Sequence, residues 1–204
     1  MHYFISNEIK KLSHLLSHII EDPHLLQKVN DIAQCCIHAL QQGKKILFAG
    51  NGGSAADSQH LAAELLSRLQ YNRPGLAAIA LTTDTSVLTA IGNDYAFQDI
   101  FSRQIESIGQ IGDVFIGIST SGRSPNILKA LEVARKKEMT TIGLTGMEAP
   151  LMDERCDLTL HVPSRETPKI QECHIMFGHI ICAIIEDVLF GEAYDPKKAK
   201  EVAS

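Results

Sequence analysis

The sequence predicts an α/β fold: a three-layer α-β-α sandwich with a five-stranded parallel sheet, preceded by two further helices. Two observations support this. From residue 44 onward, short apolar runs alternate with longer segments whose apolar residues recur at helical spacing. Before residue 44 only the helical spacing occurs. Strands that alternate with helices form parallel sheets covered on both faces.

The first 43 residues are predicted to form two helices. Apolar residues recur at helical spacing at Ile5, Ile9, Leu12, Leu16 and Ile19, and again at Leu25, Val29, Ile32, Cys36 and Leu40. Asp22-Pro23 separates the two runs, and Gly43 ends the second. Their apolar faces need partners, and a second copy of the chain would provide one. We therefore expect residues 1–43 to be a helical arm for oligomerisation and residues 44–204 to be one α/β domain.

Strands and helices then alternate along the chain. The predicted strands are short and mostly apolar: 46–49, 76–81, 113–118, 140–145 and 158–162. The predicted helices show helical spacing: 55–69, 85–92, 97–108, 125–138 and 168–190. In open parallel sheets, ligands bind beyond the carboxyl ends of the strands. The turns that follow the strands are therefore where function is expected.

Composition argues against several classes of function. The 204 residues carry 19 basic and 24 acidic side chains and no Trp, whereas a nucleic-acid surface needs a basic face. No apolar run approaches the ~18–20 residues that span a membrane, and the N-terminus lacks the apolar block of a signal peptide. The five cysteines form no C-x-x-C motif. Reduced thiols in a cytoplasmic protein are the expected interpretation.

Four hydroxyl side chains lie within residues 119–124, the turn after the third predicted strand: Ser119, Thr120, Ser121 and Ser124. The turn leads into a helix with Pro125 in its first turn. Hydroxyls and free backbone N–H groups at a helix N-terminus form a site for a phosphate. An ordinary cluster of N-cap residues is the alternative. No Gly-Lys-Ser/Thr sequence follows, so this is not a nucleotide P-loop.

Two other polar segments follow strands. Gly50-Asn51-Gly52-Gly53-Ser54 joins the first strand to a helix, and its glycines allow a ligand to approach the backbone closely. A tight structural turn is the alternative, and the absence of G-x-G-x-x-G gives little support to a dinucleotide site. Asn93-Asp94 follows the second strand. If the loop after that strand folds back, all three segments converge on one crevice.

His60 and Glu64 lie four residues apart and therefore share one face of the helix 55–69. Such a pair can bind a divalent metal or act as an acid–base pair, or it can be a solvated contact. The closing helix carries Gln171, His174 and His179 among apolar residues, and a buried polar side chain must be hydrogen-bonded or ligated. A satisfied core histidine is the alternative interpretation of His179.

Four segments together resemble the sugar isomerase (SIS) domain family: GNGGSAADSQHLAAEL (50–65), TAIGNDYAFQDIFSRQ (89–104), GDVFIGISTSGRSPNI (112–127) and KIQECHIMFGH (169–179). The resemblance covers nearly the whole chain. Within the family it is strongest to enzymes that interconvert sedoheptulose 7-phosphate and D-glycero-D-manno-heptose 7-phosphate, which supply heptose for the lipopolysaccharide core. It implies a five-stranded parallel sheet sandwiched by helices, a phosphosugar substrate and a homotetramer.

The resemblance also implies roles for residues at matching positions. The phosphate would be held by Ser119, Thr120, Ser121 and Ser124. The sugar would be contacted by Asn51, Gly52, Gly53, Glu64, Asn93, Asp94 and Gln171. One zinc ion per subunit would be bound by His60, Glu64, Gln171 and His179. Glu64 would be the general base and His179 the general acid of a proton transfer through an enediol.

Two of the implied zinc ligands are far apart in the predicted closing helix. Gln171 and His179 are eight residues apart, about 12 Å along a regular helix axis. Zinc–ligand bonds are only about 2.0–2.2 Å long. We therefore expect Gln171 to be the most dispensable of the four ligands.

Two other functions remain open at this point. A related non-catalytic branch of the family binds the bacterial replication initiator, but its members lack the residues that match Glu64 and His179. A phosphosugar sensor is the third possibility, although no attached DNA-binding segment is evident. One departure from the isomerases is Pro168-Lys169, where some members carry an acidic residue followed by Arg. The proton-handling role of that acid therefore does not transfer.

Overall fold

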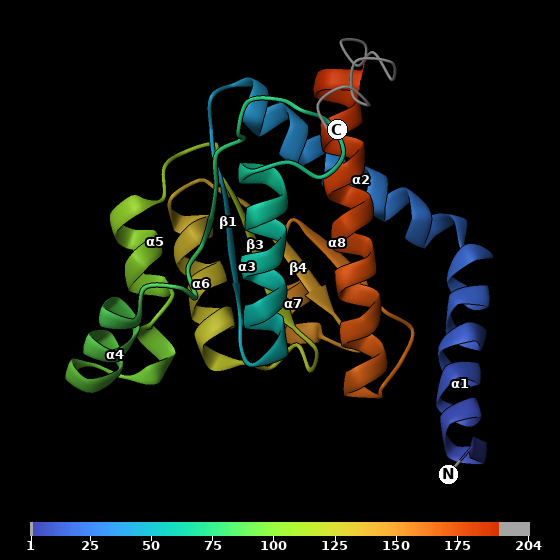
Figure 1. Cartoon of the computed structure of the whole chain (residues 1–204). Coiled ribbons are helices and arrows are strands. Elements are labelled where there is room, and N and C mark those ends of the chain that lie inside the picture. The colour runs from blue at the N-terminus through green and yellow to red at the C-terminus, as the bar shows by residue number, and fades with distance from the viewer. Residues whose placement is uncertain (1, 192–204) are drawn as a thin grey trace.

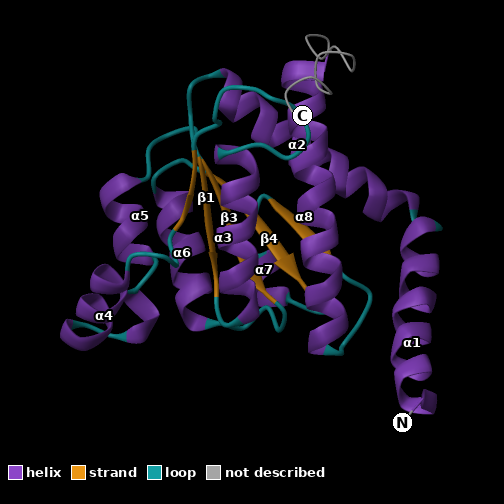
Figure 2. Ribbon diagram, in the orientation of Figure 1, coloured by secondary structure: helices purple, strands orange, loops and turns teal. Residues whose placement is uncertain are grey.

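The computed structural model describes residues 2–191, which form a five-stranded parallel sheet between two layers of helices (Figure 1, Figure 2). The strands lie in the order β2-β1-β3-β4-β5. Their bounds are β1 Ile46–Gly50, β2 Ala78–Ala80, β3 Val114–Ser119, β4 Thr140–Thr145 and β5 Leu158–His161. The predicted three-layer sandwich is confirmed. Residues 192–204, the end of the predicted domain, lie outside the described residues.

The helices divide between the two faces of the sheet. One core is formed with α1 His2–Ile20, α2 Pro23–Gln41, α3 Gly53–Leu66 and α8 Thr167–Phe190. The core on the other face is formed with α5 Ser102–Ile108, α6 Pro125–Lys136 and α7 Pro150–Asp153. Between β2 and α5 the chain forms α4 Thr85–Asp94 and the 3₁₀ helix η1 Phe97–Asp99.

Burial on both faces explains the sequences of the central strands. Successive side chains of a strand point to opposite faces of the sheet. Ile46 and Phe48 of β1 therefore join the core with α3 and α8, whereas Leu47 joins the core with α5 and α6. Every residue of β1 and β3 is buried. This is why both strands appear in the sequence as continuous apolar runs rather than as alternating ones.

Some boundaries differ from those predicted. The second strand, predicted over 76–81, spans only Ala78–Ala80, because β2 is an edge strand that pairs with β1 alone. The Leu76 N–H donates to the Leu65 carbonyl at the end of α3 instead of joining the ladder. The helix predicted over 97–108 is divided into η1 and α5. No prediction covers α7, whose four residues are too few to show a period.

The two N-terminal helices are placed differently. Asp22 caps α2 by accepting hydrogen bonds from the His24 and Leu25 N–H groups. α2 packs against α8 and β5. In contrast, α1 extends away from the sandwich (Figure 1), and only Leu15 and Ile19 of this helix are buried. The division of the chain into an arm and a domain at residues 43 and 44 stays a prediction.

α3 and α8 lie side by side and run in the same direction (Figure 1). A Cβ atom at Gly53 would overlap the Gln171 side chain, and one at Gly178 would overlap the Leu61 side chain. Farther along, Glu186 accepts a hydrogen bond from the Leu69 N–H. The contacts Gly53–Gln171, His60–His179 and Leu61–Gly178 join residues that are 117 to 119 apart in sequence. The register between α3 and α8 is therefore nearly constant over this stretch.

Contrary to the expectation that no apolar run approaches the length of a membrane span, α8 is, among residues 2–191, long and apolar enough to cross a membrane, judged by length and composition only. The core helix of a soluble protein passes the same test. Here α8 packs against α2 and α3, and Cys173, Phe177 and Ile185 are fully or almost fully buried in the core. Its apolar sequence is accounted for by this position in the sandwich.

Candidate active site

The turns after β1 and β3 lie next to each other at the carboxyl edge of the sheet, because the two strands pair in parallel up to Gly50 and Ile118. Asn51 and Asn126 connect the turns. Their side-chain amides exchange two reciprocal hydrogen bonds of 2.9 and 2.8 Å. The convergence expected for these two segments is therefore present.

The hydroxyls of the turn after β3 are not engaged as helix caps. Ser124 is the N-cap residue of α6, yet its side chain accepts no backbone N–H. Its Oγ lies 2.9 Å from the Oγ of Ser119 instead. Gly122 has φ +63°, and a Cβ atom there would overlap Ala149. This arrangement favours an anion site at the N-terminus of α6 over an ordinary cluster of caps. Thr120 is half-buried and Ser121 is exposed at the same turn.

The turn after β1 brings a second helix N-terminus to the same edge. Gly52 has φ +55°, a conformation that favours glycine, and Gly53 begins α3. The Gln171 side chain lies directly against Gly53. His60 is seven residues farther along α3, about 10 Å at 1.5 Å per residue. In this conformation Gln171 therefore lies with the ligand turns rather than with His60.

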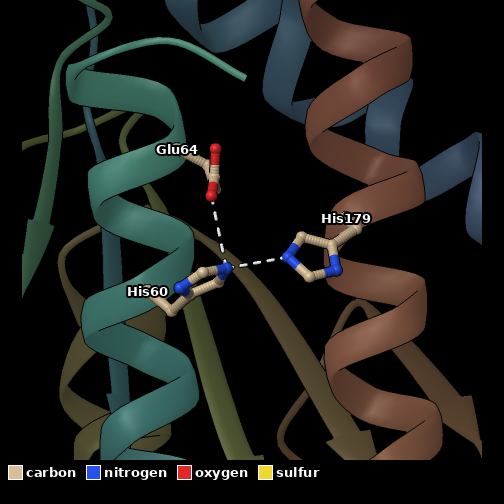
Figure 3. A group of neighbouring side chains, drawn as sticks. All are labelled: His60, Glu64 and His179. Carbon is tan, nitrogen blue, oxygen red and sulfur yellow. Dashed lines mark hydrogen bonds and ion pairs between the residues drawn. The ribbon is translucent and has the colours of Figure 1, made fainter. Parts of the chain in front are cut away.

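Three side chains from α3 and α8 meet at one point (Figure 3). The Nε2 of His60 lies 3.2 Å from Oε1 of Glu64 and 2.8 Å from Nε2 of His179. The two imidazole rings meet edge to face with their centroids 4.9 Å apart. One ligand atom from each residue lies within 4.8 Å of the other two. We call His60, Glu64 and His179 the triad.

α3 and α8 carry two further buried polar groups, neither of which is among the predicted site residues. Asp57 is almost fully buried, and its Oδ2 has no hydrogen-bond partner among the described residues. Burial raises the pKa of the Asp57 carboxyl, although the charges of His60 and His179 act in the opposite direction. Asp57 precedes His60 by three residues, so it lies on the same side of α3, and this spacing was the available signal.

The second group is the imidazole of His174. This side chain is fully buried, and its Nε2 donates to the Thr145 carbonyl over 3.1 Å. Burial lowers the pKa of His174 to about 4. The core histidine of α8 is therefore His174, whose Nδ1 has no hydrogen-bond partner among the described residues, whereas His179 is half-exposed and points toward His60.

The third predicted segment does not join the others within one chain. Asn93 and Asp94 end α4, and both are exposed. The Nδ2 of Asn93 donates to Oδ1 of Asp94 over 2.8 Å. Figure 1 shows α4 on the opposite flank of the sandwich from α8. The expected convergence of three segments on one crevice is therefore wrong for Asn93-Asp94 in a single chain, because the loop after β2 carries α4 outward.

Residues 9–146 match the SIS domain family. This chain belongs to that family. A phosphoheptose isomerase of Burkholderia pseudomallei (strain 1710b) is 52% identical over 93% of this chain and 96% of its own length. A phosphoheptose isomerase 2 of Campylobacter jejuni is 54% identical over 88% of this chain and 90% of its own. The structure of a phosphoheptose isomerase from Neisseria gonorrhoeae matches with a TM-score of 0.85 and 39% identity, covering 91% of this chain and 98% of that one.

Other solved structures share only the fold with this chain. The Vibrio vulnificus NanR protein complexed with ManNAc-6P is 17% identical, with a TM-score of 0.61, and the match covers 67% of that chain. The relatives at about 50% identity carry the isomerase name. They give no support to the alternative in which this SIS domain binds the replication initiator.

The triad fits a zinc ion of the catalytic type. Two imidazoles and a carboxylate are a ligand set of catalytic zinc sites, which keep a further position open. Bonds of about 2.0–2.2 Å in a tetrahedron place ligand atoms roughly 3.3 Å apart. The separations of 3.2 and 2.8 Å around His60 Nε2 are close to this value. All three ligand atoms lie within 4.8 Å of one another, so these residues form a group that could hold a metal ion.

Proposed function

We propose that this protein is an aldose–ketose isomerase that interconverts sedoheptulose 7-phosphate and D-glycero-D-manno-heptose 7-phosphate. The observation that carries the proposal is the meeting of Glu64 and His179, which are far apart in the sequence, beside His60. A carboxylate and an imidazole at one point provide a base and an acid for proton transfer. The names of the relatives support the same activity.

The two ends of the substrate would occupy different parts of the site. The hydroxyls of residues 119–124 and the N-terminus of α6 would bind the phosphate. The triad, about 10 Å along α3 from Gly53, would bind the reacting end of the seven-carbon chain. Between these ends the sugar would contact Asn51, Gly52, Gly53 and Gln171. Asn93 and Asp94, on the far flank of the chain, would reach the substrate of a neighbouring subunit.

The reaction moves one proton between adjacent carbons. Glu64 would remove the proton from the carbon next to the aldehyde, while His179 would donate a proton to the carbonyl oxygen to give an enediol. Glu64 would then return its proton to the former aldehyde carbon, and His179 would recover a proton from the neighbouring hydroxyl to give the ketose. Phosphate binding at residues 119–124 would hold both carbons in place.

One zinc ion per subunit would be held by His60, Glu64 and His179, with Gln171 as a weaker ligand. When bound, zinc supplies Lewis acidity that stabilises negative charge on the substrate oxygens. Coordination would lower the basicity of Glu64, so metal binding and base function would compete at this carboxylate.

The test uses purified protein and sedoheptulose 7-phosphate in D₂O, followed by NMR. We expect formation of the aldose with gradual entry of deuterium at carbon. Glu64→Gln should reduce turnover by a factor on the order of 10²–10⁴, while Glu21→Gln, an exposed residue beyond α1, should leave it unchanged. A well-folded Glu64→Gln protein with near-wild-type turnover would exclude Glu64 as the base. Binding without turnover by the wild type would favour the sensor or initiator-binding alternatives.

We also propose a cytoplasmic homotetramer that supplies heptose for the lipopolysaccharide core. The free state of all five cysteines supports a reducing compartment. The exposed apolar side chains of α1, including Tyr3, Phe4 and Ile9, support assembly with other copies.

A further inference from the structure

Arg73 and Glu186 form an ion pair that is almost completely buried. The Nε of Arg73 lies 2.9 Å from Oε1 of Glu186, and the two side chains are only 2% and 1% exposed. Arg73 lies in the segment after α3, and Glu186 lies in the last turns of α8. The pair therefore bridges the same two helices that carry the triad.

Glu186 binds the backbone of the segment that leaves α3. Its carboxylate accepts hydrogen bonds from the N–H groups of Leu69, Gln70 and Tyr71 at 3.0, 2.6 and 3.2 Å. Burial acts to raise the pKa of Glu186, but these hydrogen bonds and the one from Arg73 outweigh burial and lower it. Glu186 is therefore a charged anchor on α8.

Arg73 binds the carboxyl end of α3. Its guanidinium donates to the carbonyl oxygens of Glu64 and Leu65 at 2.9 and 2.7 Å, and also to those of Ser67 and Pro74. The last carbonyls of a helix lack partners within the helix and carry partial negative charge. A buried cation that satisfies them fixes the position of the last turn, and Glu64 belongs to that turn.

The position of this ion pair relative to the triad leads to the inference. Glu186 follows His179 by seven residues, about two turns of α8, and Arg73 bonds the backbone carbonyl of Glu64 itself. We propose that Arg73 and Glu186 are positioning residues that fix the separation between Glu64 and His179. The inference rests on the proposed function of the triad, because it assigns the pair a role in metal binding and proton transfer.

A second ion pair, whose carboxylate is buried, provides the control. Lys45 Nζ contacts Asp113 Oδ2 at 2.6 Å, and Asp113 also accepts from the backbone N–H groups of Lys45 and Gln110. Lys45 and Asp113 precede β1 and β3, so this pair lies at the amino edge of the sheet, away from the ligand turns. Its loss should destabilise the fold without moving α3 relative to α8.

The experiment compares Arg73→Lys and Glu186→Gln with Lys45→Met in the full-length protein. Arg73→Lys keeps the positive charge. The lysine ammonium lacks the planar fork of donors with which arginine bonds Glu186 and two α3 carbonyls at once. We expect Arg73→Lys and Glu186→Gln each to bind Zn²⁺ about 10–100-fold more weakly than the wild type, measured by calorimetry. In both variants the decrease in kcat should be larger than the change in KM. Lys45→Met should lower the melting temperature but leave Zn²⁺ affinity within about twofold of the wild type.

A readout without metal or substrate separates this inference from the proposed function. The ring nitrogens of His60 and His179 give NMR signals in the metal-free protein, and these should shift in Arg73→Lys and Glu186→Gln but not in Lys45→Met. If the wild type binds Zn²⁺ but does not convert the heptose phosphate, the proposed function is wrong. The Zn²⁺ affinities and the NMR signals then still test whether Arg73 and Glu186 position Glu64 and His179. Unchanged ring signals and unchanged Zn²⁺ affinity in folded Arg73→Lys and Glu186→Gln would overturn the inference.

Discussion

Ser119 and Ser124 lie at opposite ends of the turn after β3, and their hydroxyls are 2.9 Å apart. Each hydroxyl is the hydrogen-bond partner of the other. A bound phosphate would replace this neutral hydrogen bond with two bonds to a charged group, which are about twice as strong. At the scale of single residues, the turn is thus better suited to bind an anion than to stabilise the helix that follows it.

We therefore expect Ser119→Ala and Ser124→Ala each to weaken sedoheptulose 7-phosphate binding by about 1.5–3 kcal/mol, the contribution of a hydrogen bond to a charged group. Calorimetric titration measures the affinity, and thermal unfolding should show a smaller change in stability. Ser107→Ala is the control, because its hydroxyl bonds a carbonyl on the exposed side of α5. Unchanged affinity in both turn variants would place the phosphate elsewhere.

Gln171 provides a second prediction at the residue scale. Because its side chain lies against Gly53 and not within the triad, Gln171→Ala should retain much of the bound zinc. His60→Ala and His179→Ala should lose most of it. Metal analysis after dialysis measures the three variants side by side. Equal loss in all three would show that Gln171 is a full ligand and that its placement changes when metal binds.

Local patterns in the sequence are enough to predict some of these residues but not others. His60 and Glu64 are one helical turn apart, so their common face could be predicted. Their meeting with His179 depends on the register between α3 and α8, which no local period encodes, and was expected only from the family resemblance. Arg73 and Glu186 are separated by 113 residues. Such a pair becomes visible only when α8 packs against the segment that follows α3.

At the scale of elements, α8 connects most parts of the fold. It packs against α2 and α3, carries His179, and anchors the segment after α3 through Glu186. It also bonds the end of β4, because the buried His174 donates to the Thr145 carbonyl. Strand positions and the parallel sheet were predictable from apolar runs. The outward position of α4 was not, because its sequence resembles any short helix.

His174 should make stability depend on pH. The unfolded side chain titrates near 6.5, whereas burial keeps it neutral in the fold down to about 4. Between these values the unfolded state binds the extra proton, so stability falls as pH decreases from 6.5 to 4, by about 3 kcal/mol. Denaturant unfolding of the wild type and His174→Gln measures this. His174→Gln should be less stable than the wild type at pH 7, and the difference between their free energies of unfolding should shrink toward pH 4. A difference that stays constant with pH would contradict the lowered pKa of His174.

At the scale of the whole molecule, α1 is poorly held by its own chain. Tyr3 and Phe4 are 85% and 68% exposed. Lys11 pairs with Glu166 across 3.0 Å, but both side chains are exposed to solvent, which weakens such a pair. A helix with so much exposed apolar surface is better explained by contact with another copy of the chain.

Light scattering at micromolar concentration should therefore show an oligomer, and we expect a tetramer. Removal of residues 1–20 should give a smaller species that stays folded, because few core residues are lost with α1. Removal of residues 1–42 should give an unstable or aggregating protein, because Val29, Ile32 and Cys36 of α2 lie in the core. A monomeric wild-type protein would refute the oligomer.

The nearly constant register between α3 and α8 also restricts how the chain can change in length. Each residue of a helix turns by about 100° and rises by 1.5 Å. One residue inserted between Gly53 and His60, or between Gln171 and His179, would rotate every later side chain of that helix away from its partner. Substitutions alter one contact at a time, whereas a single insertion would separate the triad and the buried ion pair together. Insertions and deletions in related chains should therefore be confined to the loops between elements, and the lengths of these two helical segments should be invariant.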